Sequence, residues 1–145
     1  MAVTIKKITL WRGEVLNKPG VLAGVLGPLA DAGADLQVVM GYRHPGDSRK
    51  AAVEVSPVSG RKSTAAARAV GLSASSIPTL LVEGDNRPGL GHAITQAIAE
   101  ARINLGFLVA QVIGTRFSAV IGFEDEAASR KAASLVKKVT QPTRK

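Results

Sequence analysis

The chain has 145 residues, no cysteine and a formal net charge of +8, with 19 Lys and Arg against 11 Asp and Glu. The absence of cysteine excludes disulfides, thiol catalysis and cysteine-ligated metals. Apolar residues make up 46% of the chain but aromatic residues only 3%, so the core must consist of Val, Leu, Ile and Ala. No apolar run reaches the roughly 20 residues of a membrane-spanning helix, and no apolar segment follows Lys6 and Lys7 as in a signal peptide. We therefore expect a cytoplasmic protein.

The first half predicts a strand, a helix, a hairpin and a second helix. In order, the elements are a strand at 4–16, a helix from 21 to Gly33, strands at 34–42 and 51–55, and a helix at 60–70. Pro28 lies inside the first helix and cannot donate a helical hydrogen bond, so we expect a kink or a late helix break there. Residues 71–76 have room only for a very short fourth strand and form the best domain boundary.

The second half repeats this order. It predicts a strand at 79–83, a helix at 90–101, strands at 104–113 and 117–123, a helix from 124 to about 138, and a short last strand at 139–140. Strand–helix–strand–strand–helix–strand is the split βαβ pattern. The fold class is therefore α+β, with two ferredoxin-like βαββαβ units at 1–73 and 74–145. Each unit has an antiparallel sheet with two helices on one face.

One tetrapeptide pattern occurs in both halves, as Asn17-Lys18-Pro19-Gly20 and as Asn86-Arg87-Pro88-Gly89. The copies lie 69 positions apart (88 − 19 = 69), and apolar, acidic and amide positions around them agree at the same offset. A period this long that occurs twice indicates a duplicated domain. In both copies the Pro-Gly pair stands where a strand-like run gives way to a helix-like run. Backbone N–H groups at such a helix start suit a small polar or anionic ligand.

These residues resemble the ACT domain, a small regulatory module that binds amino acids in enzymes such as aspartokinase and phosphoglycerate dehydrogenase. The resemblance is carried by residues 14–36 and, more typically, by 81–90 and 101–105. The first copy departs from the pattern with Pro28 in its helix and Asp35 where Asn is usual. The resemblance implies a tandem ACT protein that senses a free amino acid, is no enzyme and needs no cofactor. It also implies a homodimer formed through sheet or helix pairing.

The resemblance also implies which residues bind the ligand. They are Asp85, Asn86, Pro88, Gly89, Leu90 and Asn104 in the second copy, and Asn17, Gly20, Val21 and Asp35 in the first. The ligand carboxylate would meet the helix starts, and its ammonium would meet the Asn and Asp oxygens. In this family the ligand commonly lies between the first loop of one domain and the second strand of a neighbouring one. This would place Asn86 and Gly89 opposite Asn104 of another unit, and we favour the second copy.

Other interpretations of these patterns remain open. Asn before Pro-Gly also caps turns for purely structural reasons, and a domain of this kind can serve only as a dimerisation subunit of a separate enzyme. A nucleic-acid-binding module shares the topology and would fit the basic charge. The few aromatic residues argue against it, and we interpret the charge as a solvated basic surface. His44 and His92 lack metal-ligand spacing with any partner, and no catalytic constellation is visible.

Overall fold

The computed structural model of the chain describes residues 3–141. Its strands are β1 (Thr4–Ile8), β2 (Trp11–Leu16), β3 (Val38–Arg43), β4 (Lys50–Ser56), β5 (Ser73–Ala74), β6 (Thr79–Asp85), β7 (Leu105–Ile113) and β8 (Arg116–Phe123). Its helices are α1 (Val21–Asp31), α2 (Arg61–Ala69), α3 (Leu90–Glu100) and α4 (Glu126–Thr140). No helix among the described residues combines the length and apolar character needed to cross a membrane.

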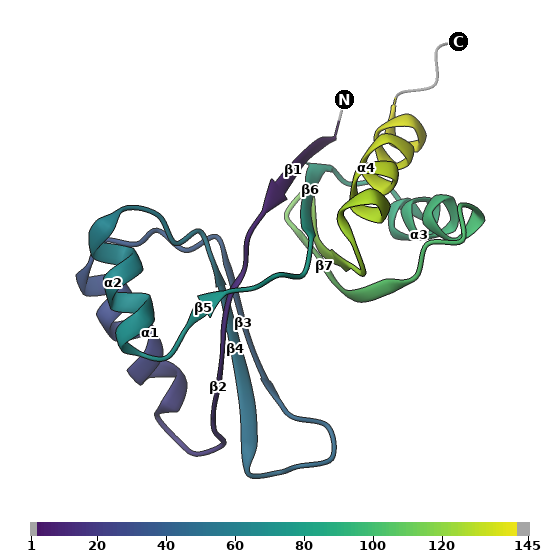
Figure 1. The fold of residues 1–145 in the computed structure, drawn as a ribbon. Coiled ribbons are helices and arrows are strands. Elements are labelled where there is room, and N and C mark those ends of the chain that lie inside the picture. Colours follow the sequence, from purple (N-terminus) through teal and green to yellow (C-terminus); the bar gives the residue numbers. More distant parts are fainter. Residues whose placement is uncertain (1–2, 142–145) are drawn as a thin grey trace. The chain divides into compact units, whose positions relative to one another are not determined.

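The chain divides into two compact units, which we call unit I (residues 9–76) and unit II (residues 1–8 with 77–145). Unit I has the antiparallel sheet order β3-β4-β2-β5, and unit II has β1-β6-β8-β7. Both sheets have the same order from one edge to the other: the strand after the first helix (β3 or β7), its hairpin partner (β4 or β8), the strand before that helix (β2 or β6) and a short edge strand (β5 or β1). Each sheet carries two helices on one face (Figure 1). The fold is therefore α+β with two ferredoxin-like units, as the sequence predicts.

The N-terminal strand belongs to unit II, which the sequence did not predict. The single strand expected at 4–16 is wrong: β1 pairs antiparallel with β6, from Thr4 opposite Glu83 to Ile8 opposite Thr79, whereas β2 pairs with β4. The short strand expected at 139–140 is also wrong, because those residues continue α4. β1 takes the place of that strand at the sheet edge. The compact units accordingly differ from the expected division at 73/74, most of all in residues 1–8.

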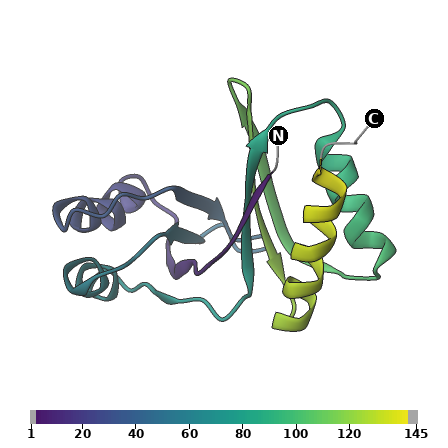
Figure 2. The ribbon, with the colours of Figure 1, turned by 90° about the horizontal axis from the view of Figure 1, so that it is seen from above.

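Each unit has its own apolar core between sheet and helices. The core of unit II is larger and contains both buried phenylalanines, Phe117 and Phe123, with Ile94 and Ile98 of α3 and Val136 of α4. Figure 2 shows α3 and α4 next to each other along this sheet. The core of unit I is made of Val, Leu and Ala side chains: Val25, Leu29, Val53, Val55, Ala67 and Leu72. Residues of β1 pack on the core of unit II, among them Ile5.

Helix α1 begins and ends where the sequence predicts. The left-handed Gly20 (φ 85°) precedes it, and Gly33 (φ 83°) follows its last turn with its N–H bonded to the Ala30 carbonyl at 3.0 Å. Pro28 has no N–H to donate to the Gly24 carbonyl, and the helix ends three residues later at Asp31. With Gly24, Gly27 and Pro28, α1 has a poor intrinsic helix propensity. Its packing through Val25 and Leu29 therefore supplies much of its stability.

Candidate functional site

The duplicated tetrapeptide builds the same turn in both units. Gly20 has φ 85° and ψ −8° before α1, and Gly89 has φ 81° and ψ 3° before α3. This left-handed conformation is one that glycine adopts without a steric penalty. The turn closes through the Val21 N–H to the Lys18 carbonyl at 3.4 Å in unit I, and through the Leu90 N–H to the Arg87 carbonyl at 3.2 Å in unit II.

The asparagine of each motif ties the turn to the neighbouring hairpin. The Asn17 N–H donates to the Arg49 carbonyl and the Asn86 N–H to the Thr115 carbonyl, both at 2.8 Å. The Asn17 side chain adds a second bond, from Nδ2 to the Ser48 carbonyl at 2.8 Å. The first asparagine therefore has a structural role, while its Oδ1 atom keeps acceptor capacity for a ligand.

A pocket lies directly beside this turn in unit I, with a volume of about 210 Å³. It is lined by residues 15–18 at the end of β2 and in the loop, 21–22 at the start of α1, 41–43 of β3 and 51–53 of β4. Two of the predicted site residues, Asn17 and Val21, are among them. The structure thus places a hollow at the first copy of the motif, the copy that the sequence analysis did not favour.

Small side chains on the strands create this hollow. Gly41 has no side chain, and a Cβ atom built on it would lie 3.5 Å from Cδ2 of Leu22. Of the three lining residues on the neighbouring strand β4, Ala51 and Ala52 have small side chains and Val53 is the third. Leu22 itself is 40% exposed and provides an apolar wall at the start of α1. A larger residue at Gly41 would fill the space that a ligand needs.

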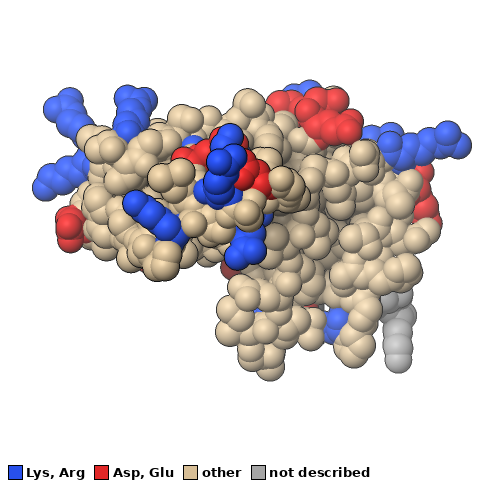
Figure 3. Space-filling view, turned by 90° about the horizontal axis from the view of Figure 1, so that it is seen from below, with Lys and Arg blue, Asp and Glu red and all other residues tan. Residues whose placement is uncertain are grey.

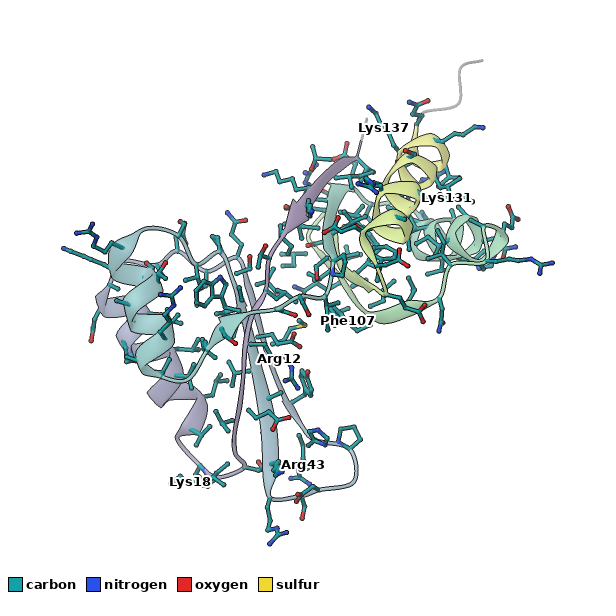
Figure 4. The ribbon with its side chains drawn as sticks, viewed as in Figure 1. Arg12, Lys18, Arg43, Phe107, Lys131 and Lys137 are labelled. Atoms are coloured by element: carbon teal, nitrogen blue, oxygen red, sulfur yellow. The ribbon has the colours of Figure 1, made fainter. Side chains whose placement is uncertain are left out.

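The charged side chains at the pocket are all cationic. Lys18 lies in the loop before α1 and Arg43 at the end of β3, and both are exposed (Figure 4). None of the described lining residues is acidic. Within residues 3–141 neither Lys18 nor Arg43 forms an ion pair, whereas Arg49 of the nearby hairpin has Asp47 at 3.6 Å. On the face that Figure 3 shows, Lys and Arg lie in several separate places with Asp and Glu between them.

The same region of unit II is built differently. Leu90 is 2% exposed and packs in the core, so only its backbone faces the turn. Asp85 pairs with Arg116 at 3.0 Å, and Nη2 of Arg87 donates to the Val139 carbonyl at 3.1 Å. Pro88 and Gly89 are exposed in the loop. The carboxylate that was predicted to meet a ligand ammonium is therefore already held by a cation of β8.

The two remaining predicted residues, Asp35 and Asn104, lie where their helices end. Each follows an 11-residue helix, so it stands at the opposite end of that helix from the Pro-Gly turn of its own unit. Such a helix spans roughly 16 Å. Nδ2 of Asn104 lies 3.4 Å from Oε1 of Glu124. The structure does not bring Asn104 to Asn86 within unit II, and their meeting across neighbouring units stays a prediction.

Sequence reasoning missed a polar cluster on β2, β3 and β4 of unit I. The hydroxyl of Tyr42 donates to Oε2 of Glu54 at 2.9 Å, and Glu54 is buried. Burial raises the pKa of Tyr42 above its ordinary value, and the Glu54 carboxylate acts in the same direction while Arg12 opposes it. The hydrogen bond with Tyr42 raises the pKa of Arg12. Because β2 and β3 lie on opposite sides of β4, only the strand pairing could have revealed this cluster.

Comparison with solved structures identifies the fold. The chain is similar to protein BT0572 from Bacteroides thetaiotaomicron, with a TM-score of 0.74 and 13% identity over 92% of this chain and 89% of that one. It is also similar to the regulatory subunit of aspartate kinase from Thermus thermophilus, with a TM-score of 0.67 and 19% identity over 97% and 99% of the two chains. The corresponding subunit from Thermus flavus gives 0.61 and 18% over 97% and 98%.

These likenesses span nearly the whole of both chains in each comparison, so the order of elements in the two units is shared as well as their individual shapes. The sequence matches no protein-family model and no curated protein. At 13–19% identity the comparison establishes architecture. The chain has the ACT-type fold found in regulatory subunits of aspartate kinase.

Proposed function

We propose that this chain is a tandem ACT protein that binds a free amino acid in the pocket of unit I and acts as a regulatory subunit or sensor without catalysis of its own. The observation that carries the proposal is the hollow beside Asn17, Val21 and the left-handed Gly20. It lies at the loop that the ACT resemblance assigns to ligand binding. A volume of about 210 Å³ suits a molecule smaller than the ligands of typical pockets, which measure roughly 300–1,000 Å³.

The composition of the pocket supports an amino acid as its ligand. Cationic side chains of Lys18 and Arg43 suit a carboxylate. Oδ1 of Asn17 suits an ammonium group. The regulatory subunits of aspartate kinase share the fold of the chain. Because those subunits are regulatory, the shared fold supports a regulatory role for this chain as well.

Pairing of two copies is part of the same proposal. β7 is the edge strand of unit II, and it carries four exposed large apolar residues: Leu108, Val109, Val112 and Ile113. An apolar edge strand with unpaired backbone groups is a site at which another chain can add to the sheet. We therefore expect a homodimer that forms at this edge. Sedimentation equilibrium would measure it, and a charged residue at Val112 should shift the equilibrium toward monomer.

Ligand binding is tested by thermal unfolding in the presence of a panel of single amino acids. A ligand that binds only the folded chain stabilises it by mass action, by about 2.7 kcal/mol at a concentration 100 times its Kd. Gly41→Val should fill the pocket and abolish the shift. Ala110→Val at the corresponding position of β7 is the matched control and should leave the shift unchanged. If no amino acid at millimolar concentration raises the midpoint of the wild-type chain, the proposal fails.

A further inference from the structure

We propose that the pocket of unit I selects an amino acid with an acidic side chain, glutamate or aspartate, and that Lys18 and Arg43 hold its two carboxylates. This inference rests on the proposed function, because it names the charge class of the ligand for the same pocket. It goes beyond what the fold implies, because the charge of the pocket lining depends on this sequence and not on the fold.

The first argument is the charge balance of the lining. Two exposed cations face this hollow, and none of its described lining residues is acidic. Neither Lys18 nor Arg43 has an ion-pair partner within the described part of the chain. The acidic residue nearest to this loop in sequence, Glu14, lies within 3.9–4.0 Å of Arg12 and His44 instead. A ligand with two carboxylates would neutralise charges that the protein itself leaves uncompensated.

The second argument is the chemistry that the lining offers to alternative ligands. A lysine or arginine ligand would bring a second cation next to Lys18 and Arg43 without any carboxylate to receive it. A purely apolar ligand would contact Leu22 and Val21 but would leave one of the two cations unused. An acidic ligand uses both, because charge-assisted hydrogen bonds from ammonium and guanidinium groups to carboxylate are the stronger kind.

The third argument is an internal comparison with unit II. At the duplication offset of 69, Lys18 corresponds to Arg87 and Arg43 corresponds to Val112. Arg87 is tied to the Val139 carbonyl at the end of α4, and Val112 has no charge. The two copies therefore share the turn, while the pair of free cations occurs only beside the turn of unit I. This difference points to recognition in unit I, since the turn itself does not require the second cation.

The test compares acidic amino acids with their neutral amides, which have nearly the same shape. Thermal unfolding and calorimetric titration of the full chain with L-glutamate, L-glutamine, L-aspartate and L-asparagine should show binding of one acidic member at least about tenfold tighter than its amide. Lys18→Gln and Arg43→Val, which copies unit II, should each weaken that binding by at least about tenfold. Lys62→Gln removes an exposed cation of α2 outside the pocket and should leave the affinity unchanged.

The possible results separate this inference from the function on which it rests. Binding of a neutral or basic amino acid that Gly41→Val blocks, with no preference for the acidic members, would overturn the charge assignment and leave the amino-acid-binding function in place. Acidic ligands that bind equally well to Lys18→Gln and Arg43→Val would overturn it too. So would a loss of affinity as large in Lys62→Gln. If none of the amino acids binds the wild-type chain, both proposals fall together.

Discussion

The hydroxyl of Tyr42 on β3 lies 2.9 Å from Oε2 of Glu54 on β4, and Glu54 is only 4% exposed. Glu54 is thus a buried acidic side chain on a central strand of unit I, and Tyr42 is its hydrogen-bond donor. Arg12, which lies opposite Glu54 in the register of β2 with β4, completes the cluster. A buried carboxylate without such partners would be costly, so these contacts make Glu54 tolerable in the sheet.

Because the pKa of Tyr42 is raised in the folded state, the stability of unit I should decrease at alkaline pH. Because the folded state favours the neutral phenol, the contribution of Tyr42 is fully present below its ordinary pKa of 10.0 and is lost as the pH rises through the higher folded value. Tyr42 is the only tyrosine, so tyrosinate absorbance reports on it alone. The folded chain should titrate at higher pH than the chain in denaturant. Coincident titration curves would contradict the prediction.

Removal of the hydroxyl should destabilise unit I at neutral pH. We expect Tyr42→Phe to lower the free energy of unfolding by about 1–2 kcal/mol, because a hydrogen bond to a charged, buried group is lost. Glu54→Gln removes the charge and serves as the second arm of a double-mutant cycle in urea unfolding. The two losses should be less than additive. Strict additivity would mean that the two side chains do not interact in solution.

Gly13 on β2 should not tolerate a side chain. A Cβ atom there would lie 2.7 Å from the Gly71 carbonyl oxygen and 2.8 Å from Cδ2 of Leu72, and the backbone oxygen cannot simply move aside. We expect Gly13→Ala to cost about 1–3 kcal/mol. The fluorescence of Trp11, the only tryptophan, follows unfolding of this unit.

Gly24→Ala is the matched control for Gly13→Ala. A Cβ atom at Gly24 would meet nothing within 4 Å, and the residue lies inside α1. We therefore expect a gain of about 0.5–1 kcal/mol, since alanine loses less backbone entropy than glycine in a helix. Equal effects of the two substitutions would show that the close approach at Gly13 does not exist in solution.

Strand β1 should stabilise unit II and not unit I. Ile5 packs on the core of unit II, so Ile5→Ala should cost about 1–3 kcal/mol and reduce hydrogen-exchange protection in β6 and β8. Protection in β2 and β4 should stay the same. Lys6→Ala, at an exposed position of the same strand, is the control and should change little. Loss of protection confined to β2 and β4 would contradict the pairing of β1 with β6.

The sequence predicts the elements of this fold well because their signals are local. The left-handed Gly20 and Gly89, the end of α1 at Gly33 and the acidic start of α4 each depend on a few neighbouring residues. Asp125, for example, accepts a hydrogen bond from the Ala128 N–H at 2.7 Å as a helix N-cap. Such contacts span three or four positions of the chain, so the pattern of residue types contains them.

The pairing of strands is different, because it joins residues that are distant in sequence. The apolar residues from Ile5 to Leu16 read as one strand, and nothing in them states that Ile8 and Trp11 belong to different sheets. That information resides in the match between β1 and β6, whose partners Thr4 and Glu83 are 79 positions apart. The cations of the pocket were missed for the same reason: Arg43 becomes a site residue only once β3 lies beside the loop at Lys18.

The position of β1 has a consequence for the order in which the protein can fold during its synthesis. β1 leaves the ribosome before the other described strands, but β6, its only strand partner in the described sheet, is not complete until residue 85. All strands and helices of unit I have appeared by residue 76. Unit I, which contains the pocket, can therefore fold before β6 is available to pair with β1. Unit II closes after unit I, because its sheet needs residues from both sides of unit I.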